Sequence, residues 1–107
     1  EMVHRCTDAA ATWPGRVEVL DLRTIVPWDV EGVLRSVRKT GRLLVVHEDT
    51  RTVGFAAEIV ATVVAEAFAS LDAPADRLTA PDCPVRAPSC AITSRPTASC
   101  CCSCWRP

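Results

Sequence analysis

The middle of the chain switches between the hydrophobic period of a strand and that of a helix. Residues 17–26 are rich in β-branched and aliphatic side chains, which favours a strand. Residues 30–40 carry apolar side chains at helical spacing, with Asp29 placed to cap the helix at its start. Residues 43–46 are wholly apolar, the pattern of a strand covered on both faces. A strand–helix–strand unit is therefore predicted.

The same pattern continues toward the C-terminus. Residues 55–68 predict a second strong helix, and residues 77–85 a last short strand that leads into a Pro-rich turn. Residues 2–11 predict one or two helical turns, and residues 13–15 a turn. Strands and helices in this order predict an α/β fold with parallel strands joined by right-handed crossovers.

Size and charge exclude several classes of function. A chain of 107 residues suits one small domain. Its formal net charge of −1 argues against an electrostatic grip on nucleic acid or anionic lipid. It has no apolar run of the roughly 20 residues that a membrane helix needs, and no signal-peptide pattern at its front. The cytoplasm is the expected location.

The composition changes near Val85. We expect residues 1–84 to form the α/β body and residues 85–107 to be a disordered tail rich in Cys, Pro, Ser and Arg. Of the seven cysteines, only Cys101 and Cys104 have the C-x-x-C spacing of a metal site, and no second pair stands at a suitable distance. The sequence predicts no metal ligands.

A shift of reading frame would explain the tail. A Cys-Cys pair read from the third base of its first codon always gives leucine, so a shifted tail would encode a leucine-rich helix. We hypothesise a single-base slip between about Val85 and Pro88.

Several segments of the body together resemble one family. They are VEVLDLRT at 17–24, PWD at 27–29, KTGRLLVVHED at 39–49 and TRTVGFAAEI at 50–59. The body is similar to the C-terminal domain of transketolase-type thiamine-diphosphate enzymes, and within them to the beta subunit of 2-oxo acid dehydrogenases of the pyruvate or branched-chain type. Val53 and Ala56 stand where family members usually carry glycine.

The resemblance implies a three-layer α/β/α domain with a mainly parallel sheet, in which a first strand before Met2 is missing. It also implies that thiamine diphosphate and Mg are held by other parts of the parent enzyme, so no catalytic or cofactor-binding residue is expected here. The implied role is subunit association: contact with the alpha subunit and a second beta subunit, and docking to the acyltransferase core. The parent enzyme would decarboxylate a 2-oxo acid and pass the acyl group to lipoamide. We expect this chain to be inactive alone.

One polar cluster is the candidate site. His47, Glu48, Asp49 and Arg51 follow the end of a predicted strand, where α/β folds place ligands. The alternative is structural: Asp49 or a neighbouring threonine caps the next helix, and Arg51 pairs with a carboxylate or another subunit. Trp28 is either an exposed interface anchor or a ring packed over its turn.

Two other functions stay open. The chain could be a piece of a transketolase or of a deoxyxylulose-phosphate synthase. It could also be a stand-alone interaction module whose cysteine tail binds a metal.

Overall fold

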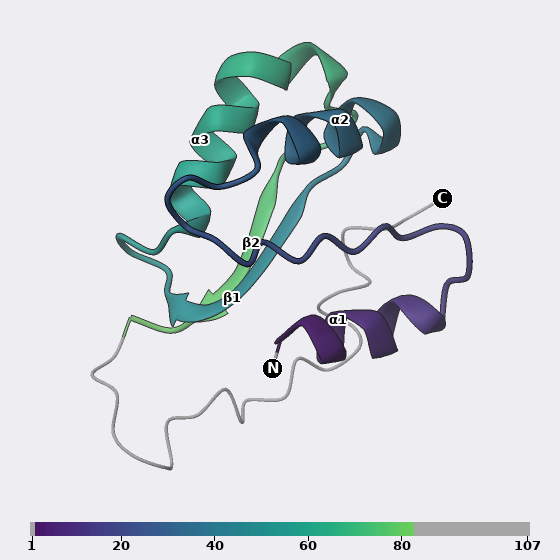
Figure 1. Cartoon of the computed structure of the whole chain (residues 1–107), viewed down its shortest axis with the longest axis horizontal. Coiled ribbons are helices and arrows are strands. Elements are labelled where there is room, and N and C mark those ends of the chain that lie inside the picture. Colours follow the sequence, from purple (N-terminus) through teal and green to yellow (C-terminus); the bar gives the residue numbers. More distant parts are fainter. Residues whose placement is uncertain (1, 83–107) are drawn as a thin grey trace.

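The computed structural model describes residues 2–82 of the chain, and Figure 1 shows how the elements are arranged. The predicted tail at 85–107 lies outside the described residues. Two parallel strands stand at the centre, with helices on either side in this view. In chain order the elements are α1 (Met2–Ala11), α2 (Val30–Thr40), β1 (Leu44–Thr50), α3 (Ala56–Ala67), the 3₁₀ helix η1 (Phe68–Ser70) and β2 (Asp76–Ala80).

Helix α2 begins and ends at the predicted residues. The Asp29 carboxylate accepts a hydrogen bond from the Gly32 N–H at 2.9 Å, so one of the helix's otherwise unpaired donors is satisfied. Gly41 ends the helix in the left-handed conformation (φ 68°), and its N–H bonds to the Val37 carbonyl at 2.8 Å. Both end signals predicted for this helix are confirmed.

The core lies between α2 and α3. These helices pack together above one side of the strands (Figure 1), and each supplies one apolar face. Leu34, Val37 and Val63 are almost completely buried at its centre. Strand and loop residues close the core from below, among them Leu22, Leu43 and Val45.

The two strands pair in parallel, as predicted. Leu44 lies opposite Asp76 and Val46 opposite Leu78, and after an irregularity Thr50 lies opposite Ala80. The predicted burial of this strand on both faces is wrong: every residue of β1 is half-buried or exposed in the described structure. α1 contacts β1 from the side away from α2 and α3 in Figure 1, so helices flank the sheet on both sides. The α/β fold class is confirmed.

The strand predicted at 17–26 is not formed. This segment runs as extended chain between α1 and α2 (Figure 1), and within the described residues 17–24 make no backbone–backbone hydrogen bond. β-branched residues favour the extended conformation, but a strand exists only where a neighbouring backbone pairs with it. No helix of residues 2–82 is long and apolar enough to cross a membrane.

Candidate functional site

One aspartate connects the carboxyl end of β2 to the loop that follows β1. Asp82, two residues beyond β2, accepts the Thr52 N–H at 2.8 Å on one oxygen and the Thr52 hydroxyl at 2.6 Å on the other. Arg77 of β2 adds a bond from its guanidinium to the Arg51 carbonyl at 3.2 Å. The loop after β1 is therefore held against the end of its neighbour strand.

These bonds lower the pKa of the Asp82 carboxyl. The Thr52 hydroxyl is the largest cause and the Thr52 backbone N–H the next, while the Arg51 charge adds a smaller attraction. Each of these groups favours the ionised carboxylate over the protonated acid. The ionised carboxylate of Asp82 is thus stabilised although this residue is exposed.

His47 faces into the same loop. Its Nδ1 accepts the Asp49 backbone N–H at 3.2 Å, which places the proton of the neutral ring on Nε2. Nε2 is buried and has no hydrogen-bond partner within the described structure. The ring packs against Gly54, where an added Cβ would lie 2.7 Å from His47 Cε1 and would collide with the Thr50 carbonyl. Gly54 is therefore required for the close approach of the loop to β1.

The other polar residues of the cluster serve the loop itself. The Asp49 carboxylate accepts the Thr50 N–H at 2.8 Å, and the Thr50 hydroxyl donates to the Thr52 carbonyl at 3.0 Å. Glu48 is exposed on β1. The predicted helix cap is wrong: α3 begins at Ala56, and its N-cap residue Phe55 provides no side-chain hydrogen bond. Asp49 and the threonines bond within the loop and to Asp82 instead. The Arg51 charge favours the ionised Asp82 carboxylate to a small extent, and pairing of Arg51 with a carboxylate or another subunit stays a prediction.

Trp28 packs over the turn that leads into α2. The ring is half-buried against the core and meets Phe55 edge to face, with ring centroids 6.1 Å apart and planes at 89°. This contact joins the starts of α2 and α3. An interface role for Trp28 stays a prediction.

The loop tip carries an unusual residue. Val53 has a positive φ of 62° and is 94% exposed. A β-branched side chain in the left-handed region is strained, whereas glycine adopts it at little cost. The glycine that the resemblance implies at this position would relieve the strain.

Metal-ligand geometry is absent from the polar residues of the cluster, all of which lie among the described residues. No group of His, Cys, Asp and Glu among residues 2–82 is placed to hold a metal ion. His47 and Asp49 each accept a backbone N–H from the residues that follow them, whereas the Arg51 carbonyl accepts a bond from Arg77 of β2. The sequence did not reveal Asp82 or its bonds to Thr52, a residue considered only as a helix cap. The rule that carboxyl ends of parallel neighbours meet at one sheet edge could have found Asp82.

The parallel sheet with helices on both sides defines an α/β domain, and comparison with known proteins specifies it. The "Transketolase, C-terminal domain" family matches residues 1–95. The chain therefore belongs to this family. The match runs eleven residues past the predicted end of the body at 84.

The similar proteins carry one kind of name. 2-oxoisovalerate dehydrogenase subunit beta 2, mitochondrial, from Arabidopsis thaliana is 54% identical over 67 residues, which is 63% of this chain and 19% of that protein. Pyruvate dehydrogenase E1 component subunit beta from Mycoplasma pneumoniae is 52% identical over 63 residues, 59% of this chain and 19% of that protein. The chain spans about a fifth of the length of these relatives.

Proposed function

We propose that this chain is a piece of the beta subunit of a thiamine-diphosphate-dependent 2-oxo acid dehydrogenase. The observation that carries the proposal is that relatives from both the branched-chain and the pyruvate type, at about half identity, are named as beta subunits. In that enzyme this domain serves subunit association and docking to the acyltransferase core. The parent enzyme oxidatively decarboxylates a 2-oxo acid and passes the acyl group to lipoamide.

The site supports a contact role better than a chemical one. The polar atoms of the loop after β1 bond mainly to one another and to Asp82. Exposed apolar side chains lie close in sequence to each of the two packed rings. Ile25 and Val26 precede Trp28, and Val53 precedes Phe55. Because Trp28 and Phe55 touch, the two loops meet, and together they offer an apolar surface of the kind that subunits bury.

The proposal is tested by co-expression with the alpha subunit of the same organism. A tagged alpha subunit should retain this chain through affinity purification and gel filtration. Val53→Asp and Val26→Asp should each reduce retention, since they place a charge in the apolar surface. Val64→Asp, on the outer side of α3, is the matched control and should leave retention unchanged. Absence of retention with the unaltered chain would reject the contact role.

Docking and location need separate measurements. Adding the acyltransferase core to the purified pair should give a larger particle in sedimentation.

The cytoplasm stays our prediction for the location. Three of the similar proteins are named as mitochondrial, and cell fractionation would reveal that alternative.

A further inference from the structure

A small groove lies between the extended segment before α2 and α2 itself. It contains an open hollow of about 280 Å³, whose lining combines an apolar side chain with charged ones. Leu20, which is 46% accessible, lines it from the extended segment, and Arg35, Ser36 and Lys39 line it from α2. Residues three and four positions apart lie on one face of a helix, so Arg35 and Lys39 are neighbours on this face.

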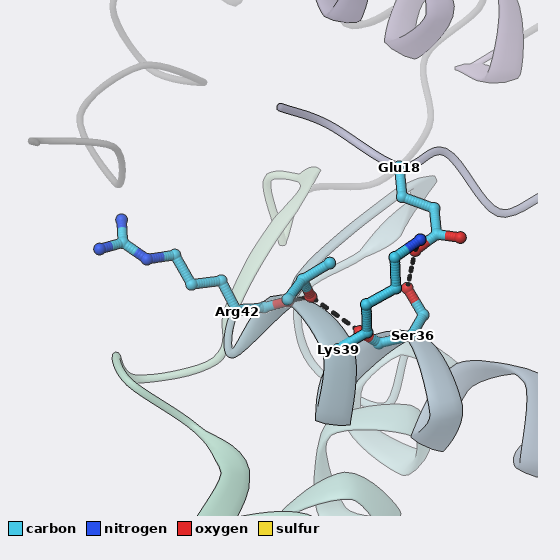
Figure 2. Close-up of polar contacts among 5 residues, drawn as sticks. Glu18, Ser36, Lys39 and Arg42 are labelled. Atoms are coloured by element: carbon cyan, nitrogen blue, oxygen red, sulfur yellow. Dashed lines mark hydrogen bonds and ion pairs between the residues drawn. The ribbon is translucent and has the colours of Figure 1, made fainter. Parts of the chain in front are cut away.

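A carboxylate of the chain itself is bound at one end of this groove. Glu18 accepts a hydrogen bond from the Ser36 hydroxyl at 2.9 Å, and the same oxygen lies 3.6 Å from the Lys39 ammonium (Figure 2). The Lys39 side chain is 71% exposed, and an ammonium has three donors, so Lys39 can contact a second carboxylate beside Glu18. This end of the groove therefore suits carboxylates.

The neighbouring cation has no such carboxylate. Arg35 is exposed, and within residues 2–82 its side chain makes no hydrogen bond or ion pair. Arg38, by contrast, lies 3.7 Å from Glu31, and Arg42 points away from Glu18 in Figure 2. Among the described basic residues of this region, Arg35 is the one that faces the groove without a partner.

The two ends of the groove differ in charge. Asp29 is the other carboxylate of the lining, and it accepts the Gly32 N–H at 2.9 Å as the cap of α2. It stands before the first turn of the helix, whereas Lys39 lies in the last turn. A carboxylate from outside is therefore attracted to the end that carries Arg35 and Lys39.

We propose that this groove binds a short peptide segment of another protein, in which an acidic side chain stands next to an apolar one. The carboxylate pairs with the Arg35 guanidinium and shares Lys39 with Glu18. The apolar side chain lies in the hollow against Leu20. A peptide is favoured over a nucleic acid or an inorganic anion, because only a peptide places an aliphatic side chain beside its negative charge. This inference does not rest on the proposed enzyme function.

Short synthetic peptides test the proposal on the full chain. Titration of the isotope-labelled chain with acetyl-GELEG-amide, followed by NMR, should move the backbone amide signals of the groove with a Kd on the order of 1 mM. The buffer must be reducing, because the seven cysteines could otherwise crosslink copies. Raising the salt concentration to about 0.5 M should weaken binding, since exposed charges are then screened.

Two control peptides separate the charged from the apolar contribution. Acetyl-GQLQG-amide lacks the carboxylates, and acetyl-GEGEG-amide lacks the apolar side chain. Each should bind about threefold or more weakly than acetyl-GELEG-amide, because each loses one of the two contacts. Equal binding of either control peptide would overturn the proposal.

Matched charge variants locate the site. Arg35→Glu should weaken binding of acetyl-GELEG-amide by about fivefold or more, whereas Arg5→Glu makes the same change of charge on α1, outside the groove, and should have little effect. Glu18→Gln should tighten binding by about twofold, because Lys39 loses its carboxylate within the chain. Glu31→Gln removes the same charge beside Arg38 and should not tighten it. Circular dichroism checks that each variant is folded.

Other occupants of the groove would give different results. An oligothymidylate that moves the same amide signals at lower concentration than the peptide would indicate a nucleic-acid site and overturn the proposal. Movement of these signals when the chain is concentrated without peptide would show that a second copy occupies the groove, which also overturns it. Absence of any movement with acetyl-GELEG-amide up to about 10 mM, or equal losses for Arg35→Glu and Arg5→Glu, would do the same.

Discussion

Residues 28–50 and residues 13–26 are both rich in apolar side chains, but they differ in how far these side chains are buried. In the first region the apolar side chains of α2 pack against α3, and Leu34 is 1% exposed. In the second region Leu22 reaches the core, while Val17, Leu20, Ile25 and others stay exposed. Helix α2 satisfies its backbone internally and needs only a surface to cover it. An extended segment needs a neighbouring backbone as well. Apolar side chains alone therefore do not make a segment a strand of the sheet.

The largest expected effect is a loss of stability in the first region, residues 28–50. Leu34→Ala should lower the free energy of unfolding by about 2–5 kcal/mol, because it removes a buried side chain and leaves a cavity between α2 and α3. Val19→Ala in the second region should cost about 0.5 kcal/mol or less. Urea unfolding followed by circular dichroism measures both. Equal losses would show that 17–24 is as firmly packed as α2.

A smaller loss is expected at the start of α2. Asp29→Ala should cost about 1 kcal/mol, since the Gly32 N–H loses its acceptor at the helix end. Asp21→Ala, a carboxylate of the extended segment paired only at the surface with Arg23, is the matched control. If the two variants unfold at the same urea concentration, the cap contributes nothing.

A gain of similar or smaller size is expected at the loop before α3. Val53→Gly should raise the free energy of unfolding by up to about 1 kcal/mol, because glycine removes the strain of the positive φ. Val53→Ala keeps a Cβ in the same conformation and should gain less. Thermal unfolding compares the three proteins, and a less stable glycine variant would contradict the strained conformation.

The smallest effect depends on pH. The pKa of Asp82 is lowered in the folded protein, chiefly by Thr52, so its contribution to stability is present above the unfolded pKa and is lost as pH falls through the folded value. The stability difference between the unaltered protein and Asp82→Asn should therefore be visible near neutral pH and vanish once the pH has fallen through the lowered folded pKa of Asp82. A difference that persists in acid would indicate another role for Asp82. Thr52→Val removes the main donor and should abolish most of the same difference.

Local signals predicted the helices well and the sheet less well. Asp29, Gly41 and the apolar stripe of α3 act through neighbours a few residues away, so the sequence reveals them directly. The segment 17–24 failed as a predicted strand because its pairing depends on residues that are distant in sequence. β1 was predicted from 43 to 46 but extends through Thr50, since β2 continues beside it.

The candidate site shows the same division. The sequence placed His47, Asp49 and Arg51 after the end of a strand, whereas β1 runs through Thr50, so His47 and Asp49 lie within the strand and Arg51 follows it. It did not predict that Thr52 would bond to Asp82, thirty residues away, or that α3 would begin without a side-chain cap. Each threonine and carboxylate had several possible hydrogen-bond partners nearby in sequence, and the sequence favoured none of them.

The sequence by itself determined the family, the two amphipathic helices and the parallel order of β1 and β2, because these depend on periodicity and on short motifs. Only the tertiary structure decided which carboxylate meets Thr52, which face of 17–24 is covered and how Val53 is strained. Those outcomes depend on which distant backbone and side chains arrive at the same place, and the free energy of such contacts is not encoded in any single segment.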